Sequence, residues 1–469
     1  MTLADKKKGV ALACIIIVVL AFIKVMFWSF GDLDELWNYN MSRGIVMGMQ
    51  PYRDFNMVQT PLFAFINAFA LLISRTLTAY RISCSVLLSV LMLLVFRTIA
   101  ARTNEYYALP VTLICLLLSG TVSYNTLFMI FALVIYLLLV RGNTSSRIFL
   151  TGISAACAAL SRQTSGGILI LTVLIILASP LGGGSSIRRR VKDVLIYLAG
   201  GAVPCVLFLI YLLAAGSFKS FWDYCFFGLF AFGSGNSLFM IEAVPCLAIA
   251  LSGIICDLLM MKTDRIRSLL HLLLGISILL IAVPITDGIH TAYAGIWFLI
   301  PVIFYLEKRF GSQLKKSMSI ASSALFAAVA VIMTVFGILG YGTVDGIPEL
   351  KGILADRYLV SDLKELSDRN KLYESEGMDV KTLSYSSVLV SVIGSDYDPV
   401  FDMFLEGNTG LTEPMEYVEE VLSRQDTIIL MPDDYSTEGW QNPEGVYEFV
   451  TSHCEVIGSY GRFKWYKPV

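Results

Sequence analysis

The segment FGDLDELWNYNMSRGIVMGMQPYRDFNMVQTP, from Phe30 to Pro61, decides how this chain is interpreted. Charge is costly near hydrocarbon, so acidic residues grouped beside an apolar run indicate a functional site. A solvated acidic loop is the simpler alternative. The order of the features favours a site: an acidic pair, a stretch of tyrosine, asparagine and small residues, then Gly-x-x-Pro-Tyr-x-Asp and a proline-led apolar run. The carboxylates of this segment are Asp32, Asp34, Glu35 and Asp54.

The composition indicates a membrane protein. Hydrophobic residues make up 56% of the 469 positions, charged residues only 15%, and the mean hydropathy is +0.71. Soluble domains carry about 25% charged residues, so we expect a polytopic α-helical membrane protein. The net charge of −2 indicates no particular partner, and without a basic patch that includes aromatics no nucleic acid is expected. Eight of the nine cysteines lie in or beside apolar runs, which is typical of small apolar residues rather than of disulfides.

The N-terminus predicts a first span that stays in the protein. Lys6 to Lys8 precede an apolar run of about 20 residues, which is enough to cross ~30 Å of hydrocarbon. No small-residue cleavage site follows, so this run is not expected to be a signal peptide. The lysines should remain in the cytoplasm, which places the acidic segment outside.

Basic residues set the expected topology of the later runs. If residues 61–74 cross the membrane, the five basic loops that follow all fall outside; if they lie along the interface or re-enter, all five fall inside, as the positive-inside rule requires. We therefore predict about eleven transmembrane helices plus one interfacial helix, in a multi-pass protein of the plasma membrane with a cytoplasmic N-terminus. The apolar runs after the first span centre near residues 61–74, 81–100, 106–120, 126–140, 148–160, 165–179, 193–214, 239–260, 268–286, 291–307 and 318–340.

The tail differs in composition from the rest of the chain. Charge and turn residues rise from about residue 345, and about 120 residues are enough for a small α/β domain. We predict a transmembrane domain over residues 1–344 and an extracytoplasmic α/β domain over residues 345–469. Within the tail the expected strands are 382–394 and 426–432, and the expected amphipathic helices are 361–369 and 414–424.

Several short motifs share one predicted face of the membrane and occur in a characteristic order. Together they resemble the GT-C fold glycosyltransferases, which include the protein O-mannosyltransferases and aminoarabinose transferases and use polyprenyl-phosphate sugars. The resemblance covers roughly residues 10–310. It implies an enzyme that moves a sugar from a polyprenyl phosphate to a glycan, lipid or protein acceptor in the cell envelope. The motifs are Asp34-Glu35, Pro51-Tyr52-Arg53-Asp54, Ser123-Tyr124-Asn125, Arg162-Gln163 and Pro284 to His290.

The acidic pair is the predicted catalytic group. Glycosyl transfer from a lipid phosphate needs a carboxylate that takes the acceptor proton as the sugar migrates. By resemblance Asp34 corresponds to the catalytic base of the family, and Glu35 and Asp32 are the nearest substitutes for it. The alternative is a structural carboxylate at a helix start, because acidic residues are common in a first helical turn.

The donor phosphate is anionic, and the guanidinium fork of arginine can hold two of its oxygens. By resemblance Arg162 corresponds to a basic residue that contacts donor phosphate; the alternative is an arginine that reaches for the membrane interface. Asp287 and His290 lie three residues apart, so a helix would present both on one face toward phosphate, sugar hydroxyls or a metal. The predicted donor- and phosphate-binding set is Arg53, Asp54, Arg81, Arg162, Gln163, Asp287 and His290.

Tyr124 and Asn125 could hydrogen-bond a sugar, although an interfacial tyrosine more often anchors the protein to the membrane. The chain departs from the family pattern at Asn125, where relatives often carry an acidic residue, so a metal-binding role there is not supported. With three histidines in the whole chain we expect no zinc site and no other cofactor. The predicted substrate-binding set is Tyr52, Tyr124 and Asn125.

Two other classes of function fit parts of the sequence. A transporter or flippase of lipid-linked or envelope precursors would use intramembrane acids and broken helices. A non-catalytic membrane scaffold would use the tail to bind a partner. The charged groups are expected at the outer face rather than at mid-bilayer, which favours the enzyme.

Overall fold

The computed structural model describes residues 3–27, 30, 32–182, 186–235, 238–338, 341–344, 347–383, 407–410, 412–432 and 445–469, and the statements below concern those residues. The chain forms two compact units. The helices α4 (Leu77–Ala100), α9 (Ile187–Ala214) and α14 (Gly288–Ile338) contribute residues to both units. The first unit comprises Met1–Met26, Cys84–Ile210 and Ser237–Phe336, and the second comprises Phe27–Ser83, Tyr211–Asn236 and Gly337–Val469.

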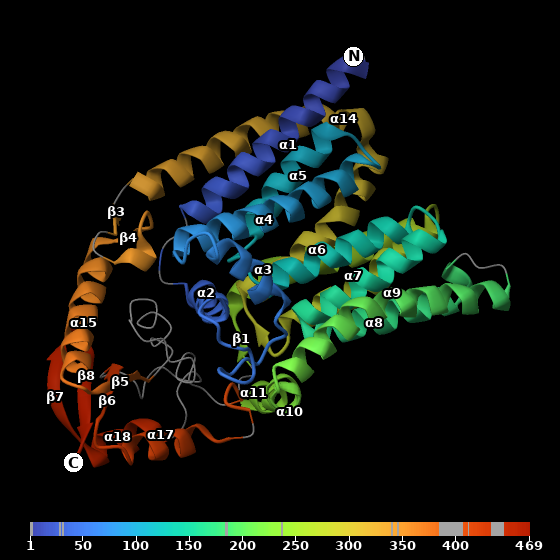
Figure 1. Cartoon of the computed structure of the whole chain (residues 1–469). Coiled ribbons are helices and arrows are strands. Elements are labelled where there is room, and N and C mark those ends of the chain that lie inside the picture. The colour runs from blue at the N-terminus through green and yellow to red at the C-terminus, as the bar shows by residue number, and fades with distance from the viewer. Residues whose placement is uncertain are drawn as a thin grey trace. The chain divides into compact units, whose positions relative to one another are not determined.

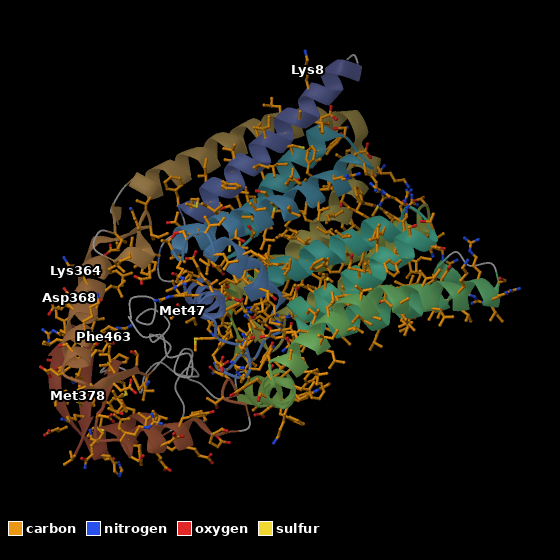
Figure 2. All side chains as sticks on the ribbon, in the orientation of Figure 1. Lys8, Met47, Lys364, Asp368, Met378 and Phe463 are labelled. Carbon is orange, nitrogen blue, oxygen red and sulfur yellow. The ribbon has the colours of Figure 1, made fainter. Side chains whose placement is uncertain are left out.

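The first unit consists mainly of apolar helices, among which α6, α7 and α8 pack in sequence order (Figure 1). Lys8 projects from the N-terminal part of α1 (Figure 2). The helices of this unit are α1 (Leu3–Met26), α4 (Leu77–Ala100), α5 (Glu105–Leu118), α6 (Tyr124–Leu139), α7 (Ser145–Ser161), α8 (Gln163–Ala178), η1 (Pro180–Gly182), α9 (Ile187–Ala214), η3 (Ile241–Ala243), α12 (Val244–Met260), α13 (Arg265–Leu279), η4 (Leu280–Ala282) and α14 (Gly288–Ile338).

Helices of membrane-spanning length confirm the predicted class. In the described part of the chain, six helical segments are long and apolar enough to cross a bilayer, whereas others are apolar but shorter. Each predicted run overlaps a helix, but the total of about eleven spans stays a prediction. The six segments are Lys8–Met26, Leu77–Ala100, Ile187–Ala214, Ile241–Met260, Arg265–Ala282 and Gly288–Gly311.

The run predicted as a span over residues 268–286 ends earlier than expected. Helix α13 stops at Leu279, a short 3₁₀ turn follows, and Ile285–Thr286 (β2) pairs in parallel with Leu238–Phe239 (β1). The run still contains a segment of membrane-spanning length, Arg265–Ala282, but its last residues are extended, because apolar residues alone do not distinguish helix from extended chain. As a result, main-chain oxygens of this segment can bond to side chains.

Helix α7 and helix α9 approach each other closely at glycines. A Cβ atom added at Gly152 would overlap the main-chain oxygen of Tyr197, and one added at Gly200 would overlap that of Phe149. Helices in lipid associate largely through such close packing of small residues, because burial of apolar surface drives them together only weakly. Beyond this contact, much of the surface of α9 is exposed apolar side chain.

The second unit contains both the acidic segment and the tail. Its first part consists of helices, including a π-helix (η2). The short strands β3 and β4 pair in antiparallel fashion at the start of the tail. The elements are α2 (Leu33–Val46), α3 (Leu62–Leu71), α10 (Phe218–Trp222), η2 (Asp223–Gly228), α11 (Leu229–Gly235), β3 (Tyr341–Thr343), η5 (Pro348–Leu350), β4 (Leu354–Asp356), α15 (Arg357–Ser375), β5 (Asp379–Thr382), α17 (Pro414–Leu422), β6 (Thr427–Pro432), α18 (Val446–His453), β7 (Cys454–Tyr460) and β8 (Phe463–Pro468).

The tail contains a four-stranded sheet in the order β5-β6-β8-β7, in which only the β5–β6 pair is parallel. Helices α17 and α18 bury Val418 and Val450 in one core with Ile429 of β6. Helix α15 is amphipathic: it buries Leu363, whereas Lys364 lies on its outer side (Figure 2).

The structure confirms several elements predicted for the tail. The two expected helices lie in α15 and α17, and the second expected strand is β6. Of the first expected strand, 382–394, only the first two residues are described, and the rest lies outside the described part of the chain. The domain boundary at residue 344 and the extracytoplasmic location stay predictions.

Candidate active site

Arg162 lies at the centre of a polar cluster in the first unit. It stands in extended conformation between α7 and α8, and its side chain is buried, with 8% of the residue exposed. The guanidinium donates to Asn125 Oδ1 at 2.6 Å, and its Nε donates to Ser165 Oγ at 3.2 Å. Nη2 donates to the main-chain oxygens of Ile281 and Val283 at 3.1 and 3.4 Å. These four acceptors are neutral oxygens, and together they fix the position of the guanidinium.

The burial of Arg162 argues against an interfacial anchor. A snorkelling arginine extends its charged end into water. Arg162 instead places it against the first turn of α6, where Ser123 caps the helix and its hydroxyl accepts from the main-chain N–H of Asn125. The Tyr124 ring lies 5.8 Å from the Arg162 Cζ atom. Gln163 follows Arg162 as the first residue of α8, and both Gln163 and Tyr124 are half-buried.

The same contact bears on a metal at this place. Asn125 Oδ1 accepts from the cationic Arg162 side chain, and a metal ion bound to that oxygen would lie against a positive charge. Among the residues that the structure describes, no three His, Cys, Asp or Glu side chains gather into a possible metal site. The donor set around Asn125 therefore fits an anion better than a cation.

Asp287 and His290 form a second feature of the first unit, at the start of α14. His290 Nδ1 lies 2.9 Å from both carboxylate oxygens of Asp287, and the His290 main-chain N–H donates to Asp287 Oδ1 at 2.7 Å. Burial acts to raise the pKa of Asp287, but hydrogen bonds from His290 outweigh it and lower the pKa below the usual value. The pairing orients the imidazole, so Nε2 is the nitrogen through which His290 can meet a ligand.

The acidic segment begins helix α2 of the second unit. The Asp32 carboxylate accepts from the main-chain N–H of Glu35 at 3.0 Å, which makes Asp32 the N-cap. Asp34 lies in the first turn and is half-buried. Its main-chain oxygen accepts from Asn38 Nδ2 at 2.8 Å. The structural interpretation therefore holds for Asp32, and Asp34 stays the candidate base.

Glu35 and Arg81 form a buried ion pair. Arg81 donates to the two Glu35 oxygens at 2.7 and 2.6 Å. The side chain of Glu35 is 5% exposed and that of Arg81 is 0% exposed. Burial raises the pKa of Glu35, and the charge and hydrogen bonds of Arg81 oppose that shift. This geometry does not support the roles predicted for them, catalysis for Glu35 and phosphate binding for Arg81, because each satisfies the other away from solvent.

The Pro-Tyr-Arg-Asp motif forms a closed turn. The Asp54 carboxylate accepts from the main-chain N–H of Gln50 at 2.7 Å, and the Asp54 N–H donates to the Gln50 oxygen at 2.9 Å. The exposed Arg53 side chain forms a two-point contact with Asp54 at 2.7 and 2.8 Å. The hydrogen bond from Arg53 lowers the pKa of Asp54. Asp54 is thus engaged in closing the turn, whereas Arg53 remains an exposed cation beside it.

Tyr52 does not have the surroundings expected for a substrate-binding residue. It is 2% exposed, and its hydroxyl donates to the main-chain oxygen of Gln59 at 2.8 Å. Its φ of 69° lies in the left-handed region, which is uncommon for residues other than glycine. Its ring packs edge-on against Phe221. Its burial and these contacts favour a structural role for Tyr52 in the turn over the predicted substrate-binding role.

Sequence reasoning did not identify a polar network beneath Asp34. Gln59 Nε2 donates to Asn38 Oδ1 at 2.8 Å, and Asn38 in turn contacts the Asp34 main chain. Asn38 is fully buried and Gln59 is 4% exposed. A side-chain amide among apolar residues is a signal in the sequence that could have indicated this network, because a buried polar group needs a partner.

Comparisons with known proteins identify the fold. No known protein-family profile matches the chain, and no curated protein sequence does either. Among solved structures, ArnT from Cupriavidus metallidurans in the apo state aligns over 99% of this chain and 98% of its own, with a TM-score of 0.61 and 10% identity. The ArnT structure bound to undecaprenyl phosphate aligns over 98% of this chain and 98% of its own, with a TM-score of 0.60 and 11% identity.

A second protein shows the same likeness. The oligosaccharyltransferase AglB from Archaeoglobus fulgidus, in complex with an inhibitory peptide and a dolichol-phosphate, aligns over 99% of this chain and 74% of its own. The TM-score is 0.52 and the identity 10%. These values confirm the resemblance inferred from the motifs at the level of the fold. The chain has the GT-C fold of the membrane glycosyltransferases.

Proposed function

We propose that this protein is a membrane glycosyltransferase that moves a sugar from a polyprenyl-phosphate donor to an acceptor of the cell envelope, on the outer face of the membrane. The acceptor is a glycan, a lipid or a protein. The N-terminus is cytoplasmic in this proposal, and the tail domain is extracytoplasmic, as the positive-inside rule favours.

One observation carries the proposal: the guanidinium of Arg162 is buried and is fixed in place by hydrogen bonds to Asn125 and to the main chain of Ile281. This occurs in a fold shared with a protein crystallised with undecaprenyl phosphate. A guanidinium stays protonated at any physiological pH, so Arg162 provides a fixed positive charge that favours a phosphate nearby. The half-buried His290, oriented by Asp287, adds a second possible donor to an anionic or hydroxylic ligand. Arg53 is an exposed cation. Gln163 directly follows Arg162 in the sequence, Tyr124 directly precedes Asn125, and both carry polar groups.

Asp34 takes the proton of the acceptor in the proposed reaction. The acceptor hydroxyl or amine gives its proton to the carboxylate as the acceptor atom bonds to the anomeric carbon of the sugar. The bond from that carbon to the phosphate oxygen breaks, and the prenyl phosphate leaves with the electron pair. Arg162 stabilises the negative charge on that leaving phosphate.

The test of the proposal is sugar transfer by the purified protein. Reconstitute it in vesicles, supply prenyl-phosphate donors with a labelled sugar, and add cell-envelope fractions as acceptors. Transfer of label into an envelope fraction supports the enzyme. Movement of intact donor across the vesicle membrane, with no label transferred, would instead identify a transporter. If the protein shows neither activity with any of these donors, the scaffold interpretation remains.

The binding role of Arg162 predicts a graded loss of donor affinity. Arg162→Gln should weaken the affinity for prenyl-phosphate sugar by about 10–100-fold, since a hydrogen bond to a charged group contributes about 1.5–3 kcal/mol. Arg162→Lys should also weaken it, because a lysine cannot place a planar fork between Asn125 and Ile281. Measure donor binding by titration on protein whose melting temperature has been checked.

Arg147→Gln is the matched control, since Arg147 lies in the first turn of the same helix α7, at its opposite end. It should leave donor affinity unchanged. Unaltered affinity in both Arg162 variants would make that residue a structural arginine and would move the phosphate-binding role to Arg53.

A further inference from the structure

A short turn in the tail has unusual backbone angles and buries polar side chains, unlike an ordinary surface loop. Residues Gly407 to Gly410 read Gly-Asn-Thr-Gly, and the two glycines have φ angles of +81° and +71°. L-residues with side chains rarely adopt such values. Asn408 and Thr409 between them are each 1% exposed. Polar residues this deeply buried point to a specific docking of the turn.

The turn docks on the helices that follow Tyr211 in the second unit. A Cβ atom at Gly407 would overlap the main chain of Gly228 and Phe232, and one at Gly410 would lie 2.7 Å from Asp223 Oδ2. The turn therefore packs backbone against backbone on the π-helix η2 and on α11. Single turns of π-helix are rare and are frequent at functional sites.

The same turn holds the segment that follows the Pro-Tyr-Arg-Asp motif. Asn56 Nδ2 donates to the main-chain oxygen of Asn408 at 2.8 Å, and both residues are buried. At the other end of this segment, Cys225 of η2 and Tyr52 both contact the main-chain oxygen of Gln59. Residues 56–59 are thus fixed at one end by the turn and at the other by Tyr52 and by Cys225 of η2, the helix on which the turn docks.

From this segment the contacts continue to the candidate base. The Gln59 side chain donates to Asn38, and Asn38 donates to the main-chain oxygen of Asp34, each at 2.8 Å. Every contact along this path lies within the second unit. A shift of residues 56–59 therefore moves Asn38 and changes the support of the first turn of α2.

We infer that the Gly407–Gly410 turn is a positioning element for the reaction: it holds residues 56–59, and through Gln59 and Asn38 it orients Asp34. The inference rests on the proposed function for the role of Asp34. The turn itself touches no reacting atom. Its loss lowers the rate of the chemical step while donor binding is retained, because correct placement of a base affects the transition state more than the ground state.

The test replaces the one side chain that joins the turn to the segment. Asn56→Leu keeps a similar size and removes the hydrogen bond to Asn408. We expect kcat for sugar transfer to fall about tenfold, the effect of ~1.4 kcal/mol on the barrier, with KM for the donor within about twofold of wild type. Gly410→Ala disturbs the turn itself, because alanine is strained at a φ of +71° and its Cβ would lie 2.7 Å from Asp223 Oδ2, and it should give the same split between kcat and KM.

Thr78→Val is the matched control. The Thr78 hydroxyl donates to the main-chain oxygen of Lys351 at 2.7 Å, so this variant also removes a hydrogen bond to the tail, but outside the path to Asp34. It should leave kcat and KM unchanged. Equal losses of kcat in Thr78→Val and Asn56→Leu would show general loosening of the tail and would overturn the inference.

Hydrogen exchange gives a second measurement that does not need an active enzyme. In the full-length Asn56→Leu protein, amide exchange should accelerate at residues 56–59 and in the first turn of α2, and not in α18. Acceleration confined to the tail, or none anywhere, would refute the positioning role. A wild-type protein that transfers no sugar would contradict the proposed function alone, and the exchange result would still decide whether the turn supports α2.

Discussion

Asp34→Asn should abolish sugar transfer, with a loss of about 10²–10⁴ in rate, while donor binding remains close to wild type. Asparagine keeps the size of the side chain but cannot accept the acceptor proton. The helix should survive the change, because the hydrogen bond that Asp34 receives from Asn38 goes to its main-chain oxygen. Measure transfer with saturating donor, and measure donor affinity separately.

Asp32→Asn provides the control for loss of charge at the same helix end. Asp32 is the N-cap of α2, and asparagine caps a helix about as well as aspartate. This variant should therefore keep most of the activity. Activity of Asp34→Asn within a few-fold of wild type, or an equal loss in Asp32→Asn, would remove Asp34 from the catalytic role.

Breaking the Glu35–Arg81 pair should have the largest effect on stability. Arg81→Met leaves the Glu35 carboxylate buried without its partner, and such losses cost about 3–5 kcal/mol. The double variant Glu35→Leu with Arg81→Met removes both charges and should recover much of that loss, since buried ion pairs can often be replaced by apolar residues. Thermal unfolding in detergent measures both effects.

Arg53→Met is the control for this experiment. Arg53 also pairs with a carboxylate, Asp54, but at an exposed position, where ion pairs contribute little. Its melting temperature should stay near that of wild type. A double variant at Glu35 and Arg81 that is stable but has lost donor affinity would return Arg81 to the phosphate-binding set, because a purely structural pair would not affect donor binding.

The elements that sequence predicted well are those decided by local pattern. Apolar runs indicated the helices of the first unit, and the amphipathic pattern of charged and apolar residues indicated α15 and α17. The ordered motifs around Asp34 and Arg162 indicated the GT-C fold, although fold comparisons find only 10–11% identity to ArnT. Such motifs sit at helix ends, where a few polar residues stand out against an apolar background.

What sequence did not reveal depends on contacts between distant parts of the chain. Glu35 and Arg81 are 46 positions apart, and nothing in either local sequence shows that they pair. Asn56 and Asn408 are 352 positions apart. Tyr52 is found to be a buried anchor only once its hydroxyl is placed on Gln59. Each of these side chains is polar in the sequence, and only burial and partner distinguish a structural role from a functional one.

The close approach of α7 and α9 at Gly152 and Gly200 has a consequence for biogenesis. Helix α9 is apolar enough to enter the bilayer independently, so its insertion does not require the glycine contact. Docking onto α7, in contrast, requires that Gly152 and Gly200 carry no side chain. A larger residue at either glycine would produce a chain whose helices are all inserted in the membrane but in which α9 does not pack against α7. Such a defect would be seen as rapid degradation by membrane proteases rather than as an impaired enzyme.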